Sequence, residues 1–166
     1  MSDIIVLAGS TAKNMTLADT IAQECRRHDL TTEVINLAEL NLPLFTPLVD
    51  TTAEKENITA LAKTLRQARG LVFVAPEYNG GIPPVVTNFI TWMSISGQDW
   101  RECFNAKTAL LATHSGGGGV RFLEALRTQL AYIGMNVIGR VLLTSGQKPL
   151  NPVSLQAVVD QLRRLI

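Results

Sequence analysis

Three short segments of the sequence collect glycines, prolines, hydroxyls and amides, and each directly follows an apolar run. The segments are GSTAKNMT at 9–16, PEYNGGIPP at 76–84 and HSGGGGVR at 114–121. Ligands of an open parallel sheet bind beyond the carboxyl ends of its strands, near the point where the strand order reverses. Because all three segments follow predicted strands, we expect them to form the walls of one ligand site.

The first segment, 9–16, has the residue types of a phosphate site. The hydroxyls of Ser10 and Thr16, the amide of Asn14 and the cation of Lys13 lie at the amino end of a predicted helix. The unpaired N–H groups and the dipole of a helix start favour an anion. The segment is neither a Walker A loop nor a GxGxxG fingerprint. The alternative interpretation is that its hydroxyls only cap the helix.

The other two segments offer backbone freedom and a flat surface. Four successive glycines at 116–119 let the backbone approach a flat ligand and expose N–H groups, although they also suit a flexible connection. In 76–84 the prolines stiffen the backbone, Gly80 and Gly81 permit unusual dihedral angles, and Tyr78 can lie along a ring system. The alternative for this segment is a rigid turn in which Tyr78 covers the core.

Strand-like apolar runs alternate with helical patterns along the whole chain. The predicted strands are 4–8, 32–37, 71–75, 108–113 and 136–143. Runs without polar alternation are typical of strands buried on both faces, and a strand–helix–strand order makes the connections crossovers. The sequence therefore predicts one doubly wound α/β domain over 1–166, with a five-stranded parallel sheet in the common order 2-1-3-4-5 and helices on both faces. The proline-containing stretch 40–50 is expected to be a surface loop.

The predicted helix in 84–97 carries apolar residues on two sides. One sheet face cannot bury both sides, so a second covering surface is expected. We predict a homodimer or homotetramer through this helix, and a covering loop or helix of the same chain is the alternative. The two sets are Val86, Phe89, Ile90 and Met93, and Val85, Trp92 and Ile95.

Composition excludes several kinds of partner. The formal net charge of +1 gives no electrostatic reason to expect nucleic acid. The apolar runs are far shorter than the ~20 residues that cross a bilayer, and no leader precedes the first strand, so a cytoplasmic protein without membrane contact is predicted. Cys25 and Cys103 form neither a CxxC pair nor a metal-ligand cluster; no metal site is predicted, and both thiols are expected to be buried.

Together the segments resemble the NADPH-dependent FMN reductases, a flavodoxin-like family that includes quinone, azo-dye and chromate reductases. PEYNGGIPPVVTNFITW at 76–92 is similar to the family segment PEYN-G-x-P-x-x-x-K-N-x-x-D-W, with Thr87 and Thr91 in place of the lysine and the aspartate. SGGGGVRFLEALRTQLAYIGMNV at 115–137 resembles the glycine-rich loop, the helix and the next strand start of the family.

The first segment resembles the family pattern G-S-x-R-K-N-S-x-T less closely. Ala12 stands where the arginine belongs, Met15 stands where the serine belongs, and the loop is one residue short. Lysine cannot copy the bidentate phosphate contacts of arginine, so we expect weaker FMN binding than is usual for the family even if Lys13 compensates in part.

The resemblance implies FMN as the cofactor and NADPH or NADH as the co-substrate. It implies that 10–16 holds the 5′-phosphate, that 76–80 meets the ribityl chain and one ring edge, and that 115–118 meets the pyrimidine edge. The cofactor-binding residues that it implies are Ser10, Lys13, Asn14, Thr16, Pro76, Glu77, Tyr78, Asn79, Gly80, Ser115, Gly116, Gly117 and Gly118.

The implied reaction is ping-pong hydride transfer to a small flat oxidant such as a quinone or free flavin. Hydride transfer is the chemistry of the flavin itself, so no catalytic side chain is predicted, and Tyr78 is expected to shape the open face. His114 could donate a hydrogen bond to the flavin, and Arg121 and Arg127 could contact the NADPH phosphate; ordinary local roles are the alternative for all three.

Two other functions stay open at this point. One is a flavin-binding electron carrier or sensor, although carriers usually have strongly acidic surfaces. The other is a serine hydrolase built on Ser115, but Thr113 replaces the first glycine of a GxSxG elbow, and only His28 and His114 are available as the base.

Overall fold

A parallel β-sheet forms the middle layer of the structure, a computed structural model in which residues 2–166 are described. The strands run in the order β2-β1-β3-β4-β5, and β6 also pairs with β4. Every pairing is parallel, which confirms the predicted order and fold class. The strands are β1 (Ile4–Ala8), β2 (Thr32–Asn36), β3 (Gly70–Val74), β4 (Thr108–His114), β5 (Asn136–Val137) and β6 (Leu142–Thr144).

The prediction of one continuous strand over 136–143 is wrong. β5 pairs with the beginning of β4, β6 pairs with its end, and 138–141 belongs to neither strand. Arg127 donates hydrogen bonds to the carbonyl oxygens of Val137 at 3.2 Å and Gly139 at 3.3 Å. These carbonyls therefore face a side chain instead of a neighbouring strand, and a glycine inside a strand also weakens it. Arg127 thus has the local role that was the alternative to a coenzyme contact.

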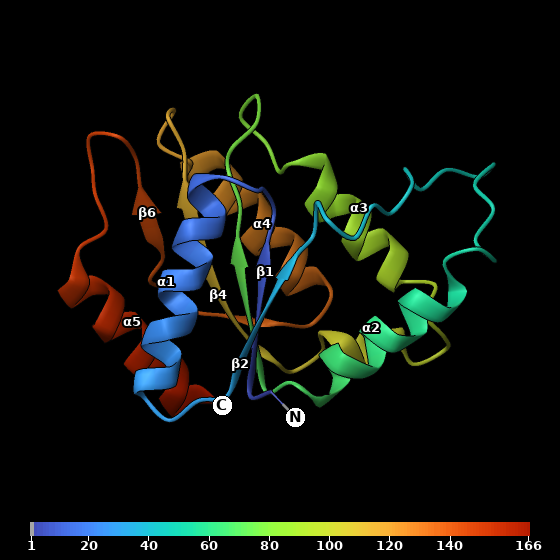
Figure 1. Ribbon diagram of the computed structural model, residues 1–166, viewed down its shortest axis with the longest axis horizontal. Helices are drawn as coiled ribbons and strands as arrows, with labels where there is room; N and C mark the ends of the chain where they lie inside the picture. The colour runs from blue at the N-terminus through green and yellow to red at the C-terminus, as the bar shows by residue number, and fades with distance from the viewer. Residues whose placement is uncertain (1) are drawn as a thin grey trace.

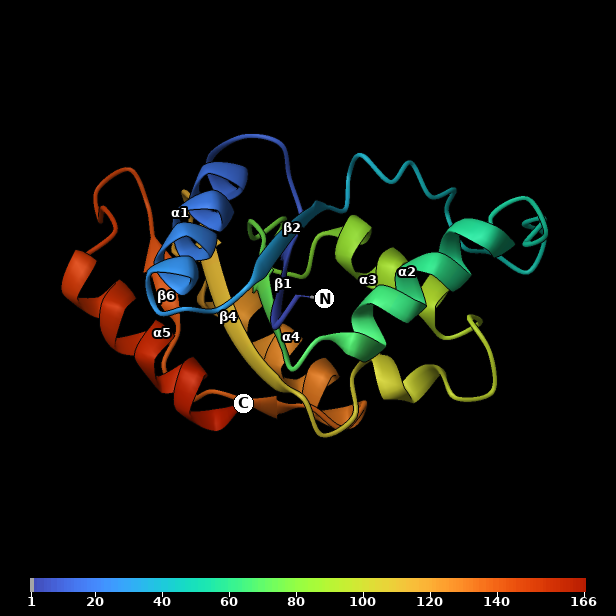
Figure 2. The same ribbon diagram turned by 60° about the horizontal axis from the view of Figure 1, so that its bottom comes forward.

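Helices cover both faces of the sheet (Figures 1 and 2). α1 and α5 pack on one face with residues such as Val6 and Val72, whereas α2, α3 and α4 pack on the other with residues such as Ile5 and Leu71. Successive strand residues point to opposite faces, so the two cores use alternate positions of the same strands. The helices are α1 (Lys13–Arg27), α2 (Lys55–Gln67), α3 (Pro84–Met93), the 3-10 helix η1 (Trp100–Cys103), α4 (Val120–Tyr132) and α5 (Pro152–Leu165).

The loop after β2 lies against α3 and is fixed there by two side chains. Asn88 Oδ1 accepts from the N–H of Phe45 at 2.8 Å, and its Nδ2 donates to the carbonyl of Pro43 at 3.1 Å. Trp92 Nε1 donates to the same carbonyl at 2.8 Å, and its ring meets that of Phe45 edge to face at 5.3 Å. A loop of the same chain therefore covers Trp92, whereas Ile95 stays 42% exposed.

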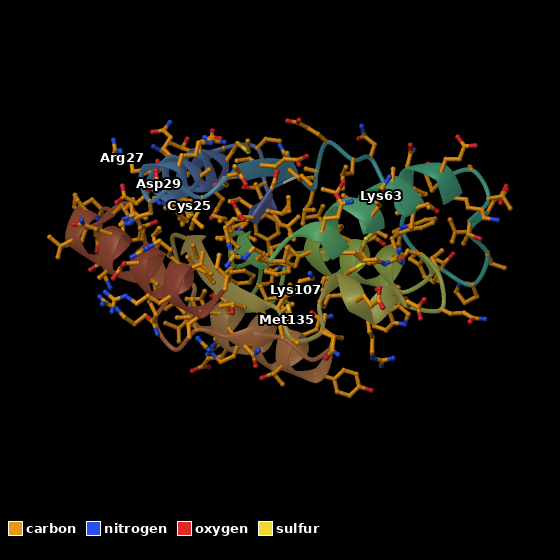
Figure 3. All side chains as sticks on the ribbon, turned by 90° about the horizontal axis from the view of Figure 1, so that it is seen from below. Cys25, Arg27, Asp29, Lys63, Lys107 and Met135 are labelled. Atoms are coloured by element: carbon orange, nitrogen blue, oxygen red, sulfur yellow. The ribbon has the colours of Figure 1, made fainter. Side chains whose placement is uncertain are left out.

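The edge of the sheet opposite the three segments is seen from below in Figure 3. Lys107 lies there at the start of β4 and donates from Nζ to the carbonyl oxygens of Arg66 at 3.0 Å and Ala68 at 2.5 Å, which joins the end of α2 to β4. Burial lowers the pKa of this ammonium group. Across residues 2–166, no helix has the length and apolar character needed to cross a bilayer.

Candidate functional site

The three segments singled out in the sequence lie at one edge of the sheet. β1, β3 and β4 are adjacent and parallel, so the connections at their carboxyl ends emerge side by side. Figure 1 shows these connections along the top of the molecule. Two side chains, Asn14 and Glu77, join the segments to one another by hydrogen bonds.

Asn14 connects the first segment to the third. Its side-chain Oδ1 accepts from the N–H of His114 at 2.7 Å, and its Nδ2 donates to the carbonyl of the same residue at 2.9 Å. Asn14 is 3% exposed, so water does not compete for these bonds. The oxygen and one N–H of the Asn14 side-chain amide thus bind within the protein, and its backbone N–H belongs to the open start of α1.

Glu77 connects the second segment to the first turn of α4, directly after the third segment. Its Oε2 accepts from the N–H of Phe122, in the first turn of α4, at 3.2 Å. A carboxylate at a helix start satisfies a free N–H group and complements the helix dipole. Arg121 lies against the second segment as well, because a β-carbon added at Gly80 would be 3.3 Å from its Nη1.

The start of α1 is open to an anion. No side chain caps this helix, and the backbone bond at its start runs from the N–H of Thr16 to the carbonyl of Ala12 at 3.1 Å. The hydroxyl of Thr16 and the ammonium group of Lys13 are exposed, and Ser10 is half-buried. These donors have the chemistry that a phosphate group requires.

Gly9 brings this loop close to the second segment. A β-carbon at this position would lie 2.7 Å from Cβ of Ala75 and 3.0 Å from a methyl carbon of Val86. The N–H of Gly9 donates to the carbonyl of Val74 at 2.8 Å. The first loop therefore rests directly on the end of β3, and only glycine permits that approach.

The second segment is a tight turn. Tyr78 and Gly81 exchange two backbone hydrogen bonds, at 3.3 and 2.9 Å. Between them Asn79 and Gly80 have φ values of 52° and 74°, as in a type I′ turn. The rigid turn is present, but Tyr78 does not cover the core, because 52% of it is exposed. Pro76 is buried at the base of the turn.

The glycines of the third segment differ in what requires them. Gly119 has a φ of 74°, and a β-carbon there would lie 2.6 Å from Cγ2 of Thr113. At Gly116 and Gly118 a β-carbon would meet no atom within 4 Å, and at Gly117 it would be 3.6 Å from Oε1 of Glu77. Gly119 is therefore needed for packing, whereas Gly116 and Gly118 leave open space above the edge of the sheet.

The serine hydrolase alternative has no geometric support. Ser115 is 6% exposed, and in residues 2–166 no hydrogen bond joins its hydroxyl to a histidine. His114 Nδ1 instead lies 3.0 Å from Thr144 Oγ1, which donates to the carbonyl of Thr113 at 3.0 Å. His28 lies at the far end of α1, with Nε2 3.4 Å from Glu24 Oε1.

Sequence reasoning missed Thr144. It was placed beyond a single predicted fifth strand, so nothing in its spacing linked it to His114. The structure ends β6 beside the end of β4, in register with His114, and thereby adds the β6–α5 connection to this edge of the sheet. Nor does the described part of the chain contain a group of three or more His, Cys, Asp or Glu side chains placed to hold a metal ion.

Comparison with known proteins identifies relatives across most of the chain. A family model described as NADPH-dependent FMN reductase matches residues 2–149. A quinone reductase of Escherichia coli is 34% identical over 57% of this chain and 52% of its own length. An NAD(P)H-dependent FMN reductase of Saccharomyces cerevisiae is 29% identical over 72% of this chain and 64% of its own. The chain thus spans about half to two thirds of these two relatives.

Solved structures share the fold at low sequence identity. A flavoenzyme NAD(P)H:(acceptor) oxidoreductase from Paracoccus denitrificans superposes with a TM-score of 0.78 at 18% identity, over 99% of this chain and 97% of its own. An archaeal flavodoxin superposes with a TM-score of 0.68 at 14% identity, over 99% of each chain. These similarities show that the chain has a flavodoxin-like fold.

Proposed function

Because the chain belongs to the NADPH-dependent FMN reductase family, we propose that it uses FMN to pass hydride from NADPH or NADH to quinones, free flavin or similar flat oxidants. The observation that carries this proposal is the hydrogen-bonded junction of the three segments at one edge of the sheet. Asn14 binds the backbone of His114, and Glu77 binds that of Phe122. Segments far apart in the sequence are thereby available to a single planar, phosphorylated ligand.

The residues at this edge fit the phosphate end of FMN. The uncapped start of α1 offers backbone N–H donors, and Ser10, Lys13 and Thr16 add two hydroxyls and a cation. Asn14 contributes its backbone N–H, since its side chain is already hydrogen-bonded. Ala12 lacks the guanidinium group that would grip a phosphate with two hydrogen bonds, so binding relies on the backbone and on Lys13.

The second and third segments fit the ring end of the same cofactor. Pro76, Glu77, Tyr78, Asn79 and Gly80 form the turn on one side, with the phenol ring of Tyr78 available for contact. On the other side the main chain of 115–118 is free of side chains except at Ser115, and its glycines permit close approach of a flat group. The glycines that take part are Gly116, Gly117 and Gly118.

Bound FMN supplies the hydride chemistry, and the protein supplies position and exclusion of side reactions. No acid–base side chain is assigned a catalytic role. With FMN held between the turn at 76–80 and the main chain of 115–118, the nicotinamide coenzyme and the oxidant would use one open face of the flavin in turn. A ping-pong sequence follows from that shared face, with a small molecule as the acceptor.

Steady-state kinetics test this proposal. Initial rates of NADPH oxidation, measured at several fixed quinone concentrations with FMN-loaded protein, should give parallel lines in double-reciprocal plots. Intersecting lines would contradict the ping-pong sequence, and the absence of NADPH oxidation would contradict the activity. Bound FMN without turnover would instead favour an electron carrier, although the net charge of +1 lacks the acidic field that such carriers use.

We also propose a homodimer or homotetramer that includes the 84–97 region. Ile95 is 42% exposed, and Leu44 and Leu48 in the loop beside α3 are 70% and 94% exposed. Exposed apolar side chains on neighbouring elements are typical of interfaces. Light scattering coupled to size exclusion should give at least twice the chain mass, and Leu48→Glu should lower it. A monomer at micromolar concentration would contradict the proposal.

A further inference from the structure

A depression of about 300 Å³ lies beside the start of α1, on the face of the sheet that α1 and α5 cover. The first turns of α1 form one wall, and the ends of β4 and β6 with the β6–α5 connection form the other. Figures 1 and 2 show this connection arching next to α1. The depression lies on the other side of the sheet from α3 and α4. Its volume is at the small end of the range of ligand pockets, roughly 300–1,000 Å³.

The polar lining of this depression favours an anion. Lys13 supplies a positive charge and has no ion-pair partner among the described residues. The hydroxyls of Thr16 and Ser145 lie in the same lining, and none of the lining residues is acidic. An ammonium group with neighbouring hydroxyl donors forms charge-assisted hydrogen bonds with a phosphate.

His114 offers the depression a hydrogen-bond acceptor. Thr144 Oγ1 uses its only proton to donate to the carbonyl of Thr113, so it accepts from His114 Nδ1 at 3.0 Å. Donation from Nδ1 corresponds to the tautomer in which Nε2 has the lone pair. A sugar hydroxyl or an exocyclic amine is the kind of donor that such a nitrogen accepts.

An apolar surface completes the depression. Leu17, Pro149 and Leu150 belong to its lining, and Leu17 and Leu150 also belong to the core between α1 and α5. Burial of a flat base against aliphatic side chains is favourable by about 25 cal/mol per Å² of apolar area removed from water. The depression thus combines a cationic end, a hydrogen-bond acceptor and an apolar surface within one small volume.

We infer that this depression binds a phosphorylated nucleoside. Lys13 and Ser145 hold its phosphate, His114 Nε2 accepts from the sugar, and the base lies on Pro149 and Leu150. Lys13 is common to this site and to the proposed FMN phosphate site, so it borders both anions. The nucleoside belongs either to the adenosine half of NADPH or to a free nucleotide. Only the first assignment rests on the proposed function.

Titration calorimetry with 2′,5′-ADP tests the inference on FMN-loaded protein and on protein without FMN. Binding should be one to one in both, and adenosine, which lacks the phosphates, should bind at least tenfold more weakly. Thr20 lines the depression and lies outside the FMN loop at 10–16. Thr20→Glu adds a carboxylate there and should weaken the binding of 2′,5′-ADP by at least tenfold. Gln23→Glu, which adds the same charge on an exposed part of α1 outside the lining, should leave binding within a factor of two.

No binding at millimolar 2′,5′-ADP, or equal effects of Thr20→Glu and Gln23→Glu, would overturn the inference. Displacement of 2′,5′-ADP by FMN would also overturn it, because the depression would then belong to the FMN site. If binding holds, competitive inhibition against NADPH identifies the coenzyme as the source, and noncompetitive inhibition identifies a free nucleotide. Because the calorimetry needs no turnover, failure of the proposed oxidoreductase activity leaves this test intact.

Discussion

The side chain of Asn14 hydrogen-bonds both backbone polar groups of His114, a residue 100 positions further along the chain. This pair joins the start of α1, the proposed phosphate site, to the end of β4, from which the glycine-rich segment emerges. Asn14 therefore acts on both ends of the proposed cofactor site through its position, since its side-chain oxygen and one side-chain N–H are used by His114.

Substitution of Asn14 should weaken binding at both ends of the site. Asn14→Ala leaves the N–H and carbonyl of His114 unpaired, at a cost of about 1–3 kcal/mol per buried group, and loosens the glycine-rich segment. We expect the Kd values of FMN and of riboflavin, which lacks the phosphate, to rise by similar factors of roughly ten. Fluorescence titration measures both.

Lys13→Ala is the matched comparison for that experiment. This substitution removes a positive charge from the proposed phosphate site. It should therefore weaken the binding of FMN and leave the binding of riboflavin nearly unchanged. If Asn14→Ala also affected FMN alone, Asn14 would be a direct phosphate ligand, and the positioning role would be wrong.

Restoring the family arginine should tighten FMN binding. Ala12 is exposed at the start of α1, so a long side chain can enter without displacing the core. A guanidinium group adds two charge-assisted hydrogen bonds to a phosphate, and we expect Ala12→Arg to lower the Kd of FMN by roughly tenfold. Ala12→Lys, which cannot bind with two parallel bonds, should give a smaller gain. Equal gains would mean that net charge alone limits affinity.

Substitutions at two glycines of the third segment should have different effects, one on protein stability and the other on FMN binding. Gly119→Ala forces a side chain into a positive-φ position and against Thr113, and should lower the free energy of unfolding by about 2–3 kcal/mol. Gly116→Ala meets no protein atom, so it should leave stability within about 0.5 kcal/mol but weaken FMN. Urea unfolding and FMN titration measure the two effects. A destabilised Gly116→Ala protein with normal FMN affinity would contradict this division.

The buried thiols should be inert in the native state. Burial raises the pKa of Cys25 from 9.0 to about 12 and raises the pKa of Cys103 as well. Because only the thiolate reacts, a disulfide reagent at pH 8 should label the unfolded protein at once and the native protein only as slowly as it opens. Rapid labelling of native protein would contradict the burial of both residues.

The same pKa shift predicts a loss of stability at alkaline pH. The folded-state pKa of Cys25 lies above that of the unfolded chain, so its contribution to stability is complete below pH 9 and declines as the pH rises toward 12. The comparison is with Cys25→Ala, which keeps every other ionisable group and whose free energy of unfolding should fall less steeply over this range. Identical slopes would contradict the assignment.

The sequence predicted the fold correctly where a residue pattern favours one kind of structural element. Short uninterrupted apolar runs such as 71–75 are typical of strands buried on both faces of a sheet, and the strand–helix–strand order then favours the parallel arrangement and the shared edge. Gly80, which was expected to permit an unusual dihedral angle, has a φ of 74° in the turn between Tyr78 and Gly81. These features depend on local periodicity and on chain connectivity, both of which are visible in the residues.

What the sequence did not reveal depends on contacts between distant residues. Nothing local shows that Arg127 takes the carbonyls of Val137 and Gly139 away from the sheet, which splits the last strand. The side chain of Asn14 has the chemistry of a phosphate ligand, and only the structure shows it bonded to His114. Trp92 lies on the second apolar side of the helix, for which the sequence left a subunit interface and a covering loop as alternatives, and only the structure shows that the loop after β2 buries it.

The central claim is that three distant segments bind one cofactor, and hydrogen exchange tests it most directly. Amide exchange of the protein with and without FMN is compared peptide by peptide. The account predicts that FMN slows exchange in 10–16, 76–80 and 115–118 together, with the same FMN concentration dependence. Protection of only one segment, or of none, would contradict it.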